Sequence, residues 1–288
     1  MLNFFKVMKY TCKQSEKLIK SLIHNVQGLS FSSAQKMLRL GKVKVNGKKT
    51  KENVVVNTSD EVDIYEFKKS MPNIPILYED ENILIVHKPY GIECATRDKS
   101  SENTYSLEEI FESKNAIVVH RLDRLTEGLV ILARNKDIAR KFEKYFKDRL
   151  IKKHYTAGVY GTVKDEGIKT AYLKKNPVTA LVEISNIAKD GFKEIITEFK
   201  TIQTANNKSI VDIILHTGRT HQIRAHFAHL GHPVLNDSKY GNKKNIVDCE
   251  YLGYFLTATK IEFNLNDKLK YLNDLNIETK PTWLEYIK

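Results

Sequence analysis

The spacing of apolar positions in the first seventy residues predicts a small α+β unit. Apolar residues at helical spacing indicate a helix over residues 14–24. A second helix is expected over residues 33–40, capped by Ser30 or Ser32 and ended by Gly41. Short apolar runs then predict strands at residues 42–45, 54–56 and 62–65. Asn46 and Gly47 predict a hairpin turn, because both residues tolerate positive φ.

Beyond residue 74 most of the apolar runs are short, which is typical of strands. A polar segment with a proline, residues 67–73, precedes them and reads as a linker. Strands are predicted at residues 76–78, 83–86, 117–119, 129–133, 152–161, 194–201, 209–215 and 255–263. Helices are predicted at residues 106–113 and 137–146, from about His221 with Thr217 or Thr220 as cap, and from about Pro281.

A dense polar group lies between the two apolar runs 117–119 and 129–133. It consists of His120, Arg121, Asp123, Arg124, Thr126 and Glu127. Buried strands on both sides should hold this loop against the core. A carboxylate between two arginines is expected to be ionised, because nearby positive charge favours the charged form. A structural salt bridge beside a tight turn at Gly128 explains the same residues.

A second polar group, residues 216–233, contains Arg219, His221 and Arg224. On a helix starting near His221, Ile223, Phe227 and Leu230 would face inward. Arginines near a helix start suit an anion, either phosphate or carboxylate. The histidines lack the spacing of a metal pair and have no accompanying carboxylate, so no metal site is expected.

The charge balance favours a polyanionic partner. The chain carries 47 basic and 35 acidic residues, a net charge of +12. Such an excess suits nucleic acid, although a generally basic surface would give the same number. The three cysteines are isolated, which fits a reducing cytoplasm. No apolar run approaches the roughly 20 residues that span a bilayer, so no membrane association is expected.

The first unit resembles the RNA-binding module of the ribosomal S-four type. The motif is Gly41-Lys42-Val43-Lys44-Val45-Asn46-Gly47-Lys48. The resemblance implies binding of structured RNA through backbone and shape contacts. The expected contacts are the basic residues on the exposed side of the second helix and the hairpin, Lys36, Arg39, Lys42, Lys44 and Lys48. A small α+β domain with a solvated basic face is the simpler alternative.

The remainder resembles the RluA-type pseudouridine synthases. Their first signature is similar to residues 120–128, and their second to residues 218–224 with His226, residues 231–233 and Asp237. Lys153 and Tyr155 resemble their Lys-x-Tyr strand, and Asp80, Lys88, Pro89 and Gly91 resemble their opening. The resemblance implies an α+β fold with a mostly antiparallel mixed sheet. The implied domains are residues 14–66 for RNA binding, 67–73 as linker and 74–288 for catalysis.

The resemblance also implies the roles of the site residues. Asp123 would be the reactive carboxylate, attacking the sugar or the base or removing a sugar proton. Arg224 would pair with Asp123, and Tyr155 would pack on the uracil and help to remove a proton. The uridine must leave its stack to be reached, and Arg121 would fill the vacated place. Further expected substrate contacts are His120, Arg219 and His221.

Isomerisation of uridine needs no redox change and no added atoms, so no cofactor is expected. The expected substrate is structured RNA, most of all large-subunit ribosomal RNA, and the expected state is a monomer. Glu127, Asn236 and Thr257 depart from the usual serine, glycine and histidine of the family, which puts substrate choice in doubt. Two other classes stay open: a non-catalytic RNA-binding or ribosome-assembly protein, and a glycosidic hydrolase with a second acid.

Overall fold

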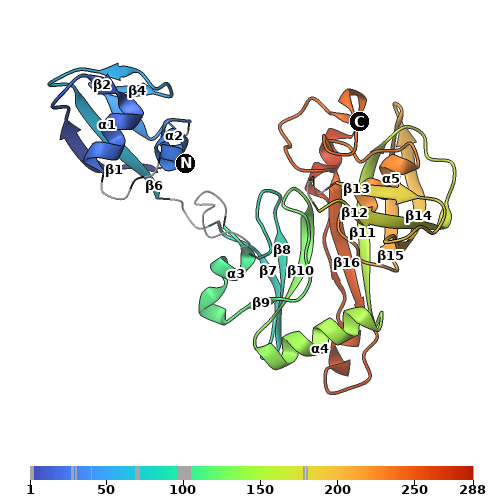
Figure 1. Cartoon of the computed structure of the whole chain (residues 1–288). Coiled ribbons are helices and arrows are strands. Elements are labelled where there is room, and N and C mark those ends of the chain that lie inside the picture. Colours follow the sequence, from blue (N-terminus) through green and yellow to red (C-terminus); the bar gives the residue numbers. More distant parts are fainter. Residues whose placement is uncertain are drawn as a thin grey trace. The chain divides into compact units, whose positions relative to one another are not determined.

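The computed structural model describes residues 3–26, 29, 31–39, 41–68, 72–95, 105–177, 179 and 181–287. The chain forms two compact units, Met1–Met71 and Pro72–Lys288 (Figure 1). Each unit has hydrophobic clusters of its own. Among the described residues, no helix is long and apolar enough to cross a bilayer.

The first unit packs two helices, α1 (Leu18–Asn25) and α2 (Phe31–Arg39), on a four-stranded sheet. The sheet order is β1-β6-β3-β4, and a separate pair joins β2 to β5. The bounds are β1 Asn3–Thr11, β2 Glu16–Lys17, β3 Val43–Val45, β4 Lys48–Thr50, β5 Val55–Val56 and β6 Glu61–Lys68. Leu18, Leu22, Leu38 and Val62 are buried in the shared core.

The first unit departs from the sequence-based prediction in several places. Helix α1 begins at Leu18 and not at residue 14, and the short strands β2 and β4 were not predicted. Strand β1, which pairs with β6 along its length, was not predicted. Helix α2 begins at Phe31, so Ser32 lies inside it and is not its cap; Ser30 lies outside the described residues. The hairpin at Asn46 and Gly47 is confirmed, since their φ values are 49° and 78° between β3 and β4.

The second unit is built on one 11-stranded mixed sheet in the order β13-β12-β14-β15-β11-β16-β10-β8-β7, with β17 beside β16 and β9 beside β10. This confirms the α+β fold with a mostly antiparallel sheet. The bounds are β7 Ile76–Glu79, β8 Ile83–Lys88, β9 Ile117–Val118, β10 Glu127–Ala133, β11 Ile151–Tyr160, β12 Gly167–Lys175, β13 Val182–Ser185, β14 Lys193–Ala205, β15 Lys208–Leu215, β16 Leu256–Phe263 and β17 Ile277–Glu278.

Helices cover parts of this sheet. Helix α4 (Lys136–Lys147) runs across the strands β8, β10 and β16 at one end, and α5 (Gln222–His229) packs beside β12–β14 (Figure 1). The short elements are α3 Leu107–Ile110 and the 3-10 turns η1 Glu112–Lys114, η2 Lys243–Asn245, η3 Lys270–Asp274 and η4 Thr282–Tyr286. The predicted final helix is therefore a 3-10 turn, which places Trp283 in the core.

Helix α5 starts differently from the prediction. Its N-cap is His221, in the left-handed conformation and without a side-chain cap. Thr217 is not the cap, because its hydroxyl accepts the amide of Ile196 and donates to Gln222. The inward positions were predicted correctly: Ile223 and Phe227 are buried, and Leu230 packs on the same core.

A parallel pairing between β10 and β16 determines where the polar loop lies. Gly128 is paired with Ala258, and a Cβ at Gly128 would come within 2.3 Å of the Ala258 carbonyl oxygen. Gly128 is paired on both sides within β10, so it is not part of a separate tight turn, and its φ of 117° favours glycine. Because the two strands approach closely here, the residues before Gly128 lie where β10 and β16 pair.

Candidate active site

The loop at residues 119–126 is tied down by Lys88 at the end of β8. The ammonium of Lys88 is fully buried and donates to the carbonyls of Pro89, Ile92 and Arg124, at 3.1, 2.9 and 3.3 Å. The Gly91 amide donates to the same Arg124 oxygen at 2.7 Å. Burial lowers the pKa of Lys88 to about 8. Lys88 therefore joins the loop after β8 to the residue that follows Asp123.

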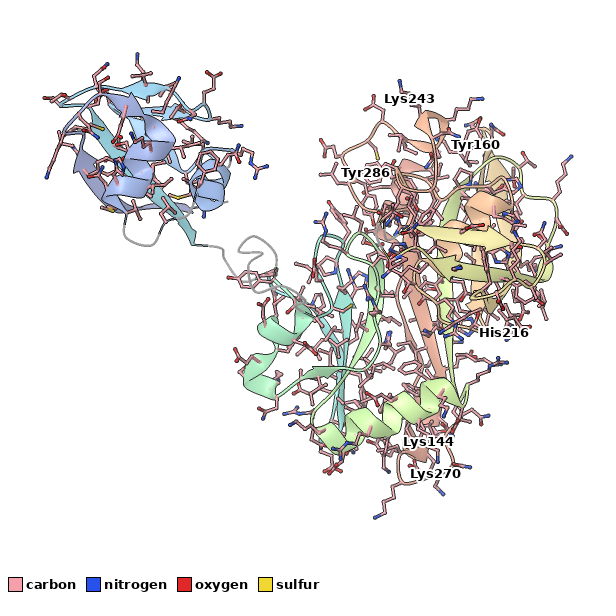
Figure 2. All side chains as sticks on the ribbon, in the orientation of Figure 1. Lys144, Tyr160, His216, Lys243, Lys270 and Tyr286 are labelled. Carbon is pink, nitrogen blue, oxygen red and sulfur yellow. The ribbon has the colours of Figure 1, made fainter. Side chains whose placement is uncertain are left out.

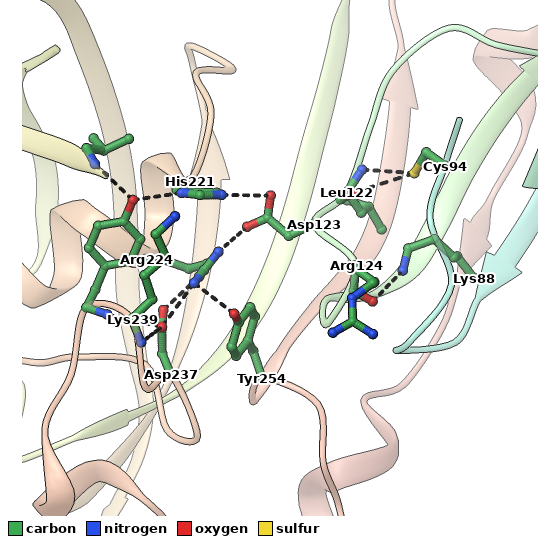
Figure 3. A network of polar contacts seen from close by, with 12 residues as sticks. Lys88, Cys94, Leu122, Asp123, Arg124, His221, Arg224, Asp237, Lys239 and Tyr254 are labelled. Carbon is green, nitrogen blue, oxygen red and sulfur yellow. Dashed lines mark hydrogen bonds and ion pairs between the residues drawn. The ribbon is translucent and has the colours of Figure 1, made fainter. Parts of the chain in front are cut away.

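Cys94 holds the residue before Asp123. Its buried Sγ accepts the Leu122 amide at 3.2 Å and lies 3.6 Å from the Leu122 carbonyl, to which the thiol donates. Figure 3 shows this contact beside the Lys88–Arg124 contact. Leu122 and Arg124, the residues on either side of Asp123, are thus both held by hydrogen bonds. The expectation that the loop is fixed against the core agrees with this arrangement.

Asp123 meets Arg224 from helix α5. Arg224 Nη1 donates to Asp123 Oδ2 at 2.7 Å, while Nε and Nη2 donate to Asp237 at 2.7 and 3.0 Å. Asp237 is fully buried and Arg224 is 2% exposed. Because Asp237 already takes two nitrogens of the guanidinium, Arg224 orients Asp123 through its remaining nitrogen. Arg121 and Arg124, which flank Asp123 in the sequence, do not make this contact.

Aromatic rings enclose the guanidinium of Arg224. Its central carbon lies 4.0 Å from the ring centre of Tyr254 and 5.1 Å from that of Tyr240, and Nη2 donates to Tyr254 Oη at 2.9 Å. Such contacts with a desolvated cation are favourable. They also fix the plane of the guanidinium, and thereby the direction from which it reaches Asp123.

Tyr155 and Asp123 line the same small cavity, together with His221 and Arg219. Tyr155 is 5% exposed. Burial, and after it the charge of Asp123, raises the pKa of Tyr155 above its usual value. The phenol is therefore protonated at neutral pH, and its expected parts in packing on the uracil and in proton removal stay predictions.

The cavity at Asp123 has a volume of about 60 Å³, room for about two water molecules. Two larger cavities adjoin it, of about 400 and 610 Å³, and Arg121 lines all three. A nucleotide can reach Asp123 only if side chains at this junction move. Arg121 is exposed and lies at the junction.

The 610 Å³ cavity is a cleft with a strongly basic lining. Its cations are Arg121, Lys147, Arg149, Lys152, Lys153 and Arg219, with Glu143 as the acidic residue of the lining. His216, also in the lining, is labelled in Figure 2 and pairs with Glu198 at 2.7 Å. Burial lowers the pKa of Lys153 to about 8. We refer to this cavity as the basic cleft.

Only some of the other expected site residues lie where they were expected. His120 turns away from Asp123: its Nε2 accepts the Ile131 amide at 3.0 Å, and burial lowers its pKa to about 3. His221 and Arg219 do line the cavity. In the first unit Arg39 and Lys48 are exposed, and Lys44 lies over the ring of Tyr65. Lys42 is buried, unlike the exposed position expected, and the side chain of Lys36 lies outside the described residues.

Four contributors to the site were not assigned to it from the sequence. Asp237 and Lys88 belong to recognised motifs, but their contacts depend on the fold. Tyr254 and Cys94 lie in segments without a motif.

The comparison with known families decides the identity. The RNA pseudouridylate synthase family matches residues 82–229, which include Asp123, Tyr155 and Arg224. The chain belongs to this family. The synthases of this family are RNA isomerases, so the protein is an enzyme that acts on RNA.

Curated relatives match nearly the whole chain. An uncharacterised RNA pseudouridine synthase of Mycoplasma capricolum subsp. capricolum is 32% identical, over 94% of this chain and 96% of the relative. A protein of Rickettsia bellii named ribosomal large subunit pseudouridine synthase C is 30% identical, over 85% of this chain and 88% of its own. A solved human structure, RNA pseudouridylate synthase domain containing 1, shares the synthase fold at a TM-score of 0.59 and 22% identity, covering 77% of this chain and 89% of its own.

Two residues that depart from the usual synthase signature contact each other. Glu127 is buried and accepts hydrogen bonds from Thr257 Oγ1 at 2.8 Å and from the Thr282 amide and hydroxyl at 2.8 and 2.6 Å. Thr257 in turn accepts the indole N–H of Trp283 at 2.8 Å. The start of β10 is thereby attached to η4.

Proposed function

We propose that this synthase converts uridine to pseudouridine in large-subunit ribosomal RNA, with Asp123 as the reactive carboxylate. The observation that carries the proposal is the ion pair of Arg224 with Asp123 in a cavity that Tyr155 also lines. The ribosomal substrate is supported by the names of relatives from Rickettsia bellii and Buchnera aphidicola, both ribosomal large subunit pseudouridine synthase C.

The proposed reaction uses this chain's residues as follows. The uridine leaves its stack, and its phosphates lie along the basic cleft. Arg121, at the junction of the cavities, moves aside and fills the vacated position in the RNA. Tyr155 packs on the uracil, and Asp123 acts while the bond from sugar to nitrogen breaks. The base turns, and the sugar carbon that left the nitrogen bonds to carbon 5 of the base. The proton of carbon 5 passes to water and the freed ring nitrogen takes up a proton, so no atoms are gained or lost overall.

Release of tritium from RNA labelled at carbon 5 of uracil tests this function. The synthase should release tritium without releasing free base. A glycosidic hydrolase would release the base, and an RNA-binding protein without activity would release neither. Mapping of pseudouridines in ribosomal RNA from cells with and without the protein then identifies the uridine, and an unchanged map would refute the ribosomal substrate.

We further propose that the first unit is a separate RNA-binding module of the S-four type and that the protein is a monomer. The support is the motif at Gly41–Lys48 and the separate core of this unit. Removal of residues 1–71 should leave the second unit folded, as reported by the fluorescence of its buried Trp283, and should weaken binding to long RNA. Unchanged affinity would contradict the RNA-binding role of the first unit.

A further inference from the structure

A series of contacts runs from strand β13 to Asp123 through Tyr240 and His221. The Val182 amide donates to Tyr240 Oη at 3.1 Å. Tyr240 Oη lies 2.7 Å from His221 Nδ1, and the other ring nitrogen of His221, Nε2, lies 3.7 Å from Asp123 Oδ1. The dashed lines on both sides of His221 in Figure 3 follow the last two contacts.

The direction of the proton between Tyr240 and His221 follows from the donors present. Burial raises the pKa of Tyr240 to about 12, so the phenol carries its single proton at neutral pH. Tyr240 Oη already accepts the Val182 amide. Within the described chain, the acceptor that faces this hydroxyl is His221 Nδ1. The proton therefore points to Nδ1, and in a neutral ring the hydrogen must lie on Nε2.

The ring of His221 is neutral in this setting. Burial lowers the pKa of His221; Asp123 opposes this shift, whereas Arg224 and Lys239 add to it. Asp237 also raises the pKa of His221, by less than the effect of Asp123. Neutral His221 then presents an N–H to Asp123 and has no free lone pair on that side.

The backbone supports a specific placement of this ring. His221 has φ 55°, in the left-handed region that residues other than glycine rarely adopt. Such strain persists where the surrounding contacts determine the conformation, and it is common at functional sites. Here the strained residue is the first before α5, three residues ahead of Arg224.

Building on the proposed role of Asp123, we propose that Tyr240 is a positioning residue that holds His221 as an Nε2–H donor facing Asp123. Arg224 donates a hydrogen bond to Oδ2, whereas the Nε2–H of His221 faces Oδ1 and stabilises its charge without a hydrogen bond. The distance of 3.7 Å exceeds a hydrogen bond, which leaves Oδ1 open to the uridine. His221 does not act as a base.

Nitrogen NMR of the full-length protein, labelled in histidine, measures the tautomer directly. The chain has nine histidines, and the signals of His221 are those lost in His221→Gln. The wild type should show hydrogen on Nε2 at neutral pH, and Tyr240→Phe should populate both tautomers. An Nδ1–H form in the wild type, or an unchanged tautomer in Tyr240→Phe, would overturn the proposal. This readout does not depend on activity.

Kinetics separate positioning from a merely structural role. Tyr240→Phe keeps the ring beside Arg224 and should lower kcat about tenfold, the loss expected for one oriented hydrogen bond, with KM nearly unchanged. Tyr271→Phe removes a hydroxyl bond of 2.7 Å to Asp80, far from Asp123 in the fold, and is the control with unchanged kcat.

A double-mutant cycle completes the test. Glutamine at position 221 can offer an N–H near the place of Nε2 without needing Tyr240. In the His221→Gln background, Tyr240→Phe should therefore lower kcat much less than it does in the wild type. Equal losses in both backgrounds would show that Tyr240 acts without His221 and would refute the proposal. Absence of tritium release from the wild type would instead refute the proposed function.

Discussion

Arg224 holds Asp123 by one nitrogen, Nη1 at 2.7 Å, and keeps its other two nitrogens on Asp237. A guanidinium can do this because its five N–H groups form a rigid fork, which lysine cannot provide. The Asp123 carboxylate is therefore oriented by a cation whose own position is set by Asp237. Removing Asp123 should leave Arg224 in place.

Asp123→Asn should reduce tritium release at least about 1000-fold, as expected for loss of the group that carries the chemistry. RNA binding and folding should persist, because Arg224 keeps its bonds to the buried Asp237. Binding is measured by titration of labelled RNA. Asp212→Asn is the control: this exposed acid bonds to Thr156 on β11 and should leave turnover unchanged. Full turnover by Asp123→Asn would remove Asp123 from its role.

Asp237→Asn should destabilise the second unit by about 3 kcal/mol, because it leaves a buried guanidinium without its balancing charge. Urea unfolding followed by the fluorescence of Trp283, the only tryptophan, reports this unit. Asp137→Asn is the matched control, since the Asp137 side chain is 88% exposed and pairs with Arg140 on the surface. Its cost should stay below about 0.5 kcal/mol. Similar losses in both variants would contradict the charge balance inferred for Asp237.

Lys88 should make the stability of the second unit rise with pH in alkaline solution. Its pKa is about 8 in the folded chain and 10.5 when exposed, so between these values the unfolded chain binds more protons. The unfolding free energy of the wild type minus that of Lys88→Met should therefore increase by up to roughly 2 kcal/mol between about pH 8 and 10.

Lys144→Met is the control for this pH series, because Lys144 is exposed on the outer side of α4 (Figure 2). It should follow the wild type at every pH. A constant difference between the wild type and Lys88→Met across the series would mean that Lys88 is not held with a lowered pKa.

The basic cleft should contribute to the salt dependence of RNA binding. Each phosphate contact adds about 0.7 to the slope of log affinity against log salt for single strands. Lys147→Gln combined with Lys152→Gln should lower the slope by roughly 1.4 if both lysines meet phosphates. Lys243→Gln combined with Lys270→Gln makes the same change in charge at exposed positions outside the cleft and should leave the slope almost unchanged. Equal slopes for the two double variants would exclude the cleft as the path of the RNA.

The sequence predicted most strands of the second unit because their apolar runs are short and bounded by polar turns. Residues 83–86 and 129–133 are examples, and both lie within observed buried strands. Strand β1 was not predicted, because its lysines interrupt the apolar alternation and its partner β6 is about fifty residues away. Pairing at that distance leaves no mark in local spacing.

The pairing of Arg224 with Asp123 joins residues 101 positions apart, and only the resemblance of two motifs pointed to it. Nothing in the spacing could show that Asp237 would take the other side of the guanidinium or that Tyr240 would reach His221. These contacts form because the fold brings the turn after α5 close to the start of that helix. The exposed position expected for Lys42 was wrong, since it was judged from charge alone and the side chain is buried.

Glu127 is bonded to Thr257 and Thr282, and Thr257 is bonded to Trp283, so the four positions depend on one another. A serine at position 127 is too short to reach the same donors, and alone it would leave buried hydroxyl and amide groups without an acceptor. Homologues that differ at one of the four sites should therefore differ at the others as well. An exchange of segments between two such homologues would succeed only if the C-terminal segment with Thr282 and Trp283 were exchanged together with the strand that follows Asp123.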